Sequence, residues 1–344
     1  MKTFRLGKTG LMVTPVGFGG IPIQRLTESE AVKVVQRCLD LGLNFFDTAN
    51  GYSVSEERIG KAVHGRRHEV IIATKTMVST PGDMVKNLDL SLQRLQTDYI
   101  DLYQLHQVGT PEAMQRVLDP ETGLFSVLEQ AKKAGKIRHI GVTSHQMDVA
   151  KQLVKSDKFE TMMFPFNFIT REPADELIPL CRQHDVGFID MKPMGGGMLM
   201  DAPIAFKWLF QYPDIAIIPG IEKVEEIEEI VALYEGSHEM THDELARMQA
   251  LKDELGTRFC RRCDYCQPCP QGIAISMLMT FPTFVKRMPP DRYLEGFIPP
   301  AMEKSLECID CGECESRCPY NLPIRQMLKE SYALYEQVKA GKAG

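Results

Sequence analysis

The sequence predicts an α/β fold, a (β/α)8 barrel (TIM barrel), followed by a small, mainly α-helical domain rich in cysteine. Two observations lead to this prediction. Short hydrophobic runs recur along the first 256 residues, with helical patterns between most of them. After residue 256 the composition changes abruptly, and cysteines and prolines become frequent. We therefore expect a barrel domain over residues 1–256 and a second domain over residues 257–344.

The strand candidates supply the number that a closed barrel needs. They lie at residues 14–18, 43–47, 70–75, 100–106, 137–142, 161–164, 186–191 and 214–218. Helical patterns separate most of them, for example at Met84–Leu95, Leu124–Gly135 and Pro173–His184. Eight parallel strands with intervening helices form the (β/α)8 arrangement.

Two capping boxes indicate where helices begin. Thr27-Glu-Ser-Glu30 precedes a helix that we expect to end at Gly42. Thr241-His-Asp-Glu244 precedes a helix that we expect to end at Gly256, where we place the domain boundary.

Charge and hydropathy narrow the classes of function. The net charge of −6 argues against general nucleic-acid binding. Charges and glycines interrupt the first ten residues before the apolar core of a signal peptide could form. Apolar runs stay well short of the ~20 residues that span a bilayer. We therefore expect a cytoplasmic protein with no nucleic-acid and no membrane partner.

Polar side chains end three successive strand candidates. Asp47 ends the run at 43–47 and is followed in the next loop by Tyr52, Lys75 ends the run at 70–75, and His106 ends the run at 100–106. The carboxyl ends of barrel strands meet at one rim, which carries the chemistry of such enzymes. The same residues would also suit an ion pair between Asp47 and Lys75 beside a buried histidine, so the pattern alone leaves both readings open.

The motif Asp47-Thr-Ala-x-x-Tyr52-x-x-Ser55-Glu56 resembles that of the aldo-keto reductase family, together with Ala73-Thr-Lys75 and Leu105-His106. Leu6-Gly-Lys-Thr-Gly-Leu-Met-Val and Gly17-Phe-Gly19 are similar to that family as well, so the resemblance spans roughly residues 1–235. Ser53 departs from it, because the family usually has glycine after the tyrosine.

This resemblance implies an oxidoreductase that reduces a small-molecule carbonyl compound or oxidises an alcohol. Tyr52 would be the general acid or base, and Lys75 would lower its pKa into a useful range. Asp47 would hold Lys75, and His106 would orient the carbonyl or relay the proton.

Glycine-rich turns follow the last two strand candidates. Gly195-Gly-Gly197 follows the seventh, and Pro219-Gly220 ends the eighth shortly before a helix that begins near Val224. In barrels these loops often bind phosphate, although a plain tight turn gives the same pattern. The resemblance implies NAD(P)H at this rim. The residues expected at the cofactor are Gly20, Thr143, Ser144, Lys192, Gly195, Gly196, Pro219, Gly220, Lys223, Glu226 and Glu229.

Several of these positions depart from the family pattern. Thr143 and Ser144 stand for the usual serine and asparagine, Met163 for the carboxamide-binding glutamine, and Met191 for the stacking aromatic residue. These changes leave a flavin as an alternative cofactor. NADP-using members carry lysine and arginine where this chain has Gly220 and Glu226. Because Glu226 would accept from a ribose 2′-OH and repel a 2′-phosphate, we expect NADH to bind at least as well as NADPH.

Eight of the ten cysteines form two runs. The first run is Cys260-x-x-Cys263-x-x-Cys266-x-x-Cys269-Pro, and the second is Cys308-x-x-Cys311-x-x-Cys314-x-x-x-Cys318-Pro. The second matches the bacterial signature for [4Fe–4S] binding, and zinc is the alternative. We expect two [4Fe–4S] clusters in a domain that resembles a ferredoxin-type dicluster domain.

Crossed ligation would follow from this resemblance. Cys260, Cys263, Cys266 and Cys318 would bind one cluster, and Cys308, Cys311, Cys314 and Cys269 would bind the other.

Two other classes of function stay open at this point. The protein could be an electron-transfer component that links the clusters to a flavin or a partner protein, or a binding protein that senses redox state.

Overall fold

The computed structural model describes residues 1–341. The chain divides into two compact units. The first comprises Met1–Gly195 with Asp201–Glu239, and the second comprises Gly196–Met200 with Met240–Gly344. We describe each unit by itself.

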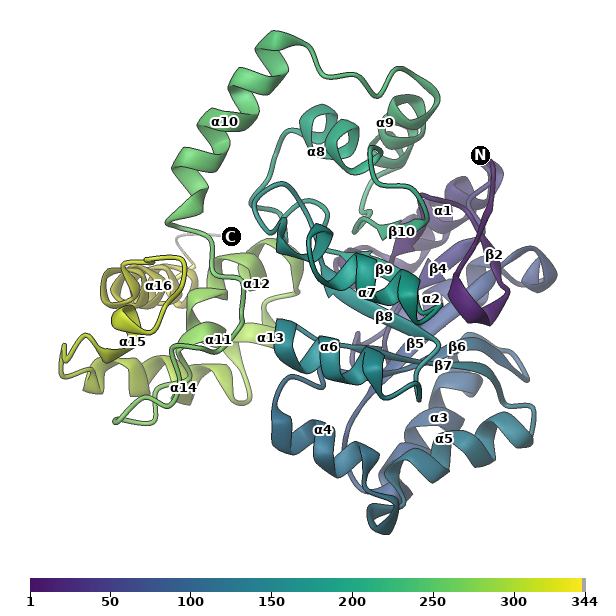
Figure 1. Ribbon diagram of the computed structural model, residues 1–344, viewed down its shortest axis with the longest axis horizontal. Coiled ribbons are helices and arrows are strands. Elements are labelled where there is room, and N and C mark those ends of the chain that lie inside the picture. The colour runs from purple at the N-terminus through teal and green to yellow at the C-terminus, as the bar shows by residue number, and fades with distance from the viewer. Residues whose placement is uncertain (342–344) are drawn as a thin grey trace. The chain divides into compact units, whose positions relative to one another are not determined.

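The first unit is built on an eight-stranded parallel sheet, which confirms the predicted barrel (Figure 1). Its strands follow one another in chain order: β3 (Phe18–Gly19), β4 (Phe45–Asp47), β5 (Ile71–Met77), β6 (Ile100–His106), β7 (Ile137–Thr143), β8 (Thr161–Pro165), β9 (Gly187–Met191) and β10 (Ile215–Ile218). Parallel bridges from Val16 to Ile217 and from Gly19 to Gly220 join the first strand to the last and nearly close the barrel.

Helices lie around the outside of these strands (Figure 1). They are α1 (Glu28–Asp40), α2 (Ser55–Ala62), α3 (Pro81–Leu95), α4 (Pro111–Leu118), α5 (Leu124–Lys133), α6 (Met147–Lys155), α7 (Leu177–Gln183), α8 (Ala202–Leu209) and α9 (Val224–Glu235). The predicted capping box at the start of α1 is present, since Thr27 and Glu30 each accept the other's backbone N–H.

Two differences from the predicted barrel concern its beginning. The first barrel strand covers only Phe18–Gly19, later in the chain than the predicted run at 14–18. An antiparallel pair of short strands, β1 (Phe4–Arg5) and β2 (Met12–Val13), precedes it. Leu6 and Val13 of this hairpin are fully buried against interior residues of the barrel such as Phe45, so the hairpin adds apolar cover that the strand count did not anticipate.

The second unit is mainly helical, as predicted. It contains α10 (His242–Gly256), α11 (Ile275–Met279), α12 (Phe281–Arg287), α13 (Asp291–Leu294), α14 (Ile298–Lys304), α15 (Glu313–Ser316) and α16 (Ile324–Lys339). Phe281 is fully buried at its core and packs edge-to-face against Tyr293 and Tyr335. The predicted capping box at Thr241 and Glu244 opens α10.

The placement of α10 differs from the expected domain boundary. The predicted barrel domain covers residues 1–256, whereas α10 groups with the second unit. Only Met248 and Leu255 of this helix are buried, so the apolar pattern of its sequence is too weak to indicate which domain it belongs to.

Among residues 1–341, no helix combines the length and the apolar character needed to cross a bilayer.

Candidate active site and cysteine cavities

Lys75 and Asp47 form a buried ion pair inside the barrel. Lys75 is on β5 and Asp47 ends β4, and both side chains are at least 96% buried. The Lys75 ammonium donates to Asp47 Oδ1 and, over 2.7 Å, to the carbonyl oxygen of Thr48. Gln104 on β6 donates from Nε2 to the other carboxylate oxygen of Asp47 over 3.1 Å. Both oxygens of Asp47 therefore accept hydrogen bonds, which fixes the carboxylate beside the lysine.

This environment keeps Lys75 charged. Burial by itself would lower the pKa of Lys75, but the negative charges around it, Asp47 first, outweigh burial and raise the pKa above its ordinary value. The barrel interior thus favours the charged form of Lys75, near the carboxyl end of β5.

Tyr52 and His106 lie beside this ion pair. The rings of Tyr52 and His106 are edge-on, with centroids 5.9 Å apart and an interplanar angle of 81°. The Lys75 Nζ atom lies 5.2 Å from the centre of the Tyr52 ring. The structure therefore brings together the four residues that end or follow three different strands: Asp47, Tyr52, Lys75 and His106.

Ser53 shows why the family pattern has glycine at this place. Its φ of 39° lies in the left-handed region, which a side chain disfavours. The Ser53 hydroxyl donates to Gln24 Oε1 over 2.8 Å, and this bond offsets part of the strain.

The expected carboxamide-binding residues lie at the end of β7. Thr143 is buried, and its Oγ1 accepts the backbone N–H of Gln107 over 2.9 Å. Ser144 is also buried, and its hydroxyl takes part in a turn with Gln146. Thr143 still has its hydroxyl proton to donate, so a carbonyl oxygen is a suitable ligand for it.

Lys192, after β9, has a neighbour that sequence reasoning missed. Its backbone is left-handed, with a φ of 63°, and its carbonyl accepts from Asn167 Nδ2 over 3.0 Å. The Lys192 Nζ atom lies 2.9 Å from Nε2 of His145. An ammonium group can only donate, so the imidazole accepts at Nε2. His145 follows Thr143 and Ser144 directly, but a lone histidine carries no signal without its partner.

The glycine-rich turns have the backbone expected of them. Gly195 and Gly196 have φ values of 56° and 70°, which a larger residue would adopt only under strain. Gly20 donates its backbone N–H to the carbonyl of Asp47 over 2.8 Å, and Pro219 accepts the N–H of Gly19 over the same distance. Gly20 thus joins the chain after the first barrel strand to β4, whereas Pro219 and Gly220 join the first strand to the last.

Glu226 has a structural partner at the beginning of α9. Its Oε2 accepts the backbone N–H groups of Glu222 over 2.7 Å and of Lys223 over 3.0 Å. These donors would otherwise be available to an anionic ligand at the helix N-terminus. A carboxylate of the chain itself therefore lies where a phosphate would bind. Lys223 and Glu229 are exposed.

The eight cysteines of the second unit line two separate cavities. One is lined by Cys269, Cys308, Cys311 and Cys314 together with apolar residues such as Ile273 and Leu328. The other is lined by Cys260, Cys263, Cys266 and Cys318. Within residues 1–341, no three His, Cys, Asp or Glu side chains converge on a point suited to a single metal ion. Four thiols around a larger, mostly apolar space fit the donor set of a [4Fe–4S] cluster.

Comparison with known proteins bears on both units. A family model described as "Aldo/keto reductase family" matches residues 15–203, and one described as "4Fe-4S dicluster domain" matches residues 259–322. The uncharacterized oxidoreductase YqkF of Bacillus subtilis is 31% identical over 218 residues, which cover 59% of this chain and 68% of the relative. The NADH-specific methylglyoxal reductase of Escherichia coli is 28% identical over 232 residues, which cover 58% of this chain and 69% of the relative.

A solved structure agrees with these sequence matches. The holo form of aldo-keto reductase AKR11C1 from Bacillus halodurans superposes with a TM-score of 0.62 at 27% identity, covering 73% of this chain and 96% of that one. The first family model covers more than half of this chain. The chain therefore belongs to the aldo/keto reductase family of oxidoreductase enzymes and carries a C-terminal 4Fe-4S dicluster domain.

Proposed function

We propose that this enzyme reduces a small carbonyl compound, or oxidises the corresponding alcohol, with Tyr52 as the general acid or base. The observation that carries the proposal is the gathering of Tyr52, His106 and the Asp47–Lys75 ion pair at one rim of the barrel. A structural ion pair alone would not need a tyrosine and a histidine beside it.

Lys75 would prepare Tyr52 for proton transfer. A free tyrosine has a pKa of ~10, which is poorly matched to neutral pH. A cation near the phenol stabilises the phenolate by Coulomb attraction, and desolvation offsets part of this effect. Asp47 and Gln104 hold Lys75 in place, and His106 would orient the carbonyl oxygen toward the Tyr52 hydroxyl.

We propose that NAD(P)H, when bound, would supply the hydride that is transferred to the carbonyl carbon. Thr143 and Ser144 would hold its carboxamide, and the Gly195–Gly196 turn would receive its phosphates. Lys192, Gly20, Pro219, Gly220, Lys223 and Glu229 complete the proposed contact set. The NADH-specific methylglyoxal reductase among the relatives and the carboxylate of Glu226 both support NADH.

We also propose that each cysteine cavity holds one [4Fe–4S] cluster with crossed ligation. The support is that Cys269 lines the cavity of the second run, and Cys318 that of the first. Clusters transfer single electrons, whereas a nicotinamide transfers a hydride. Exchange between them therefore needs a carrier that can take up a hydride and release single electrons. A flavin or an electron-transfer partner protein would serve. Such cysteines stay reduced in the cytoplasm, where we place the protein.

The test begins with anaerobic purification. Iron and sulfide counts, EPR spectra and identification of any bound organic cofactor establish what the protein carries. Reduction of aldehydes and ketones, methylglyoxal among them, is then followed with NADH and with NADPH. Turnover of at least one carbonyl compound is the expected result. Tight cofactor binding without turnover of any carbonyl or alcohol in the panel would overturn the proposal and favour an electron-transfer or sensing role.

A further inference from the structure

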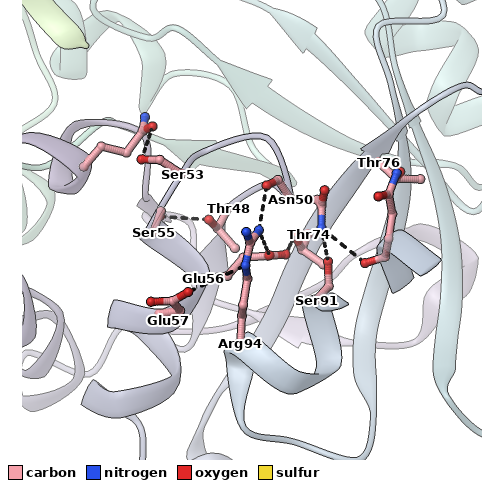
Figure 2. Close-up of polar contacts among 12 residues, drawn as sticks. Thr48, Asn50, Ser53, Ser55, Glu56, Glu57, Thr74, Thr76, Ser91 and Arg94 are labelled. Carbon is pink, nitrogen blue, oxygen red and sulfur yellow. Dashed lines mark hydrogen bonds and ion pairs between the residues drawn. The ribbon is translucent and has the colours of Figure 1, made fainter. Parts of the chain in front are cut away.

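A polar network on the outer side of the barrel sheet holds the loop that carries Tyr52 (Figure 2). Asn50, two residues before Tyr52, is its centre. The Asn50 side-chain amide donates over 3.2 Å both to Ser91 Oγ and to the carbonyl of Asn87, which are on α3. Its backbone N–H donates to the carbonyl of Lys75 over 2.9 Å. The loop is therefore attached to α3 on one side and to the strand of Lys75 on the other.

A buried carboxylate holds the other end of this loop. Glu56, four residues after Tyr52, is in the first turn of α2 and is fully buried. Its Oε1 accepts from the Thr74 hydroxyl over 2.7 Å. Burial raises the pKa of Glu56 above its ordinary value, although the Thr74 hydrogen bond and Arg94 oppose the rise. A buried carboxylate of this kind needs a cationic partner to remain ionised.

Arg94, near the C-terminal end of α3, is that partner and joins the two ends of the loop. Its Nη1 atom lies 3.1 Å from the carbonyl oxygen of Asn50 and 3.5 Å from Oε2 of Glu56. Figure 2 shows the guanidinium facing both groups. One nitrogen atom thus links a residue before Tyr52 to a residue after it. Its other contact, from Nε to the exposed Glu57 over 3.7 Å, lies outside the loop.

The same network attaches to the strand that presents Lys75. Side chains alternate along β5, so Thr74 and Thr76 face outward while Lys75 faces the interior. Thr74 donates to Glu56, and the Thr76 hydroxyl accepts from Asn87 Nδ2 over 3.1 Å. The positions of Tyr52 and Lys75 therefore depend on one set of hydrogen bonds behind the sheet.

We propose that Arg94 is a positioning residue for Tyr52: by linking Asn50 to Glu56 it fixes the tyrosine ring relative to Lys75 and so sets the reactivity of the phenol. Only the kinetic test of this inference depends on the proposed function, because it needs a carbonyl compound that the enzyme reduces. Arg94 does not touch the reacting atoms, so it acts through the loop and not through the substrate. Lys75, with its partner Asp47, and His106 face the Tyr52 ring.

Arg94→Met tests the inference by kinetics. Small displacements of a catalytic group cost rate more than binding, so we expect kcat for carbonyl reduction to fall at least about tenfold while KM changes less than about twofold. Arg94→Lys, which keeps the charge but not the planar guanidinium, should recover part of the rate. Glu57→Gln is the matched control, because it removes only the exposed contact of Arg94, and it should behave as the unchanged protein.

A double-mutant cycle separates positioning from general destabilisation. In a Tyr52→Phe background, Arg94→Met should have no further effect on the residual rate, because the group that it positions is absent. A loss of equal size in that background would overturn the inference. Unfolding followed by the fluorescence of Trp208, the single tryptophan, shows whether each variant is folded. If Arg94→Met does not fold, the same double-mutant cycle is measured with Arg94→Lys.

Titration of Tyr52 tests the inference without catalysis. The ultraviolet difference between the protein and its Tyr52→Phe variant isolates the ionisation of this phenol. We expect Arg94→Met to move that ionisation to higher pH, because the phenol moves away from Lys75. An unchanged titration together with an unchanged kcat would overturn the inference. If the unaltered protein reduces no carbonyl compound, the proposed function fails, while the titration still decides the role of Arg94.

Discussion

The ammonium nitrogen of Lys75 lies 5.2 Å from the centre of the Tyr52 ring, although the two residues come from different elements. Lys75 is fixed within β5, whereas Tyr52 is in a loop that follows β4. The Coulomb energy between a cation and a phenolate depends on their separation. The ionisation of the Tyr52 phenol therefore depends on how firmly its loop is held in position.

Tyr52→Phe should bind the dinucleotide as the unchanged protein does and lose carbonyl reduction by about 10²- to 10⁴-fold, the usual contribution of general acid catalysis. Stopped-flow binding and steady-state rates measure the two effects separately. Tyr234→Phe is the control, since Tyr234 lies near the C-terminal end of α9, and its ring contact with Phe210 is kept by phenylalanine. Retained turnover in Tyr52→Phe would exclude Tyr52 as the acid.

NADH should bind at least as tightly as NADPH, because the carboxylate of Glu226 occupies the two N–H groups at the start of α9. Glu226→Ser should raise the affinity for NADPH by about tenfold or more, since it removes a negative charge and releases these donors. Glu225→Gln, a change at the exposed neighbour, should leave the NADH to NADPH ratio unchanged. Dissociation constants from fluorescence titration give the answer, and a tenfold preference of the unaltered protein for NADPH would contradict the prediction.

Cys318→Ala should damage the cluster bound mainly by the first cysteine run, because Cys318 lines the same cavity as Cys260, Cys263 and Cys266. Cys269→Ala should in turn damage the cluster of the second run. Iron counts and EPR spectra of the two variants, compared with Cys263→Ala and Cys311→Ala, distinguish the clusters. A Cys318→Ala spectrum that matches Cys311→Ala would show that ligation is not crossed.

The clusters should carry electrons during turnover. The anaerobic protein, reduced by a low-potential one-electron donor, should convert a carbonyl substrate without added NAD(P)H, and a flavin or a partner protein should be required for it. A structural role is the alternative, because a small module often needs metal to fold. Activity that needs only NAD(P)H, with a cluster EPR signal that never changes, would support that alternative.

Glu160 should make the stability of the barrel depend on pH. Burial raises its pKa, but hydrogen bonds from His139, Lys132 and the backbone N–H of Ile140 outweigh burial and lower the pKa from 4.5 to about 2. The carboxylate then stabilises the fold fully above pH ~4.5, by roughly 3 kcal/mol, and this stability is lost as the pH falls toward 2.

Glu160→Gln should therefore lower the free energy of unfolding at pH 7 and have a progressively smaller effect below pH 4. Urea unfolding followed by Trp208 fluorescence reports on this unit, because Trp208 is on α8. A difference between the two proteins that stays constant from pH 7 to pH 3 would contradict the assignment.

The sequence by itself determined the features that depend on local pattern. Hydrophobic runs at strand spacing predicted the barrel, and capping boxes predicted the starts of α1 and α10. Polar residues at three strand ends predicted a common rim, because parallel strands of a barrel present their carboxyl ends on one side. Cysteine spacing predicted a site for two clusters, since the second run matches the bacterial [4Fe–4S] signature and the first supplies four more cysteines.

Only the tertiary structure decided which distant groups meet. Gln104 is one of several polar residues on β6, and Arg94 is one arginine on an amphipathic helix, so neither has a pattern that indicates a role. That the Glu226 carboxylate accepts two backbone N–H groups at the start of α9 is likewise visible only in the structure. The physical reason is that hydrogen bonds and ion pairs act over about 3–4 Å between residues far apart in the chain, and the fold alone sets those distances.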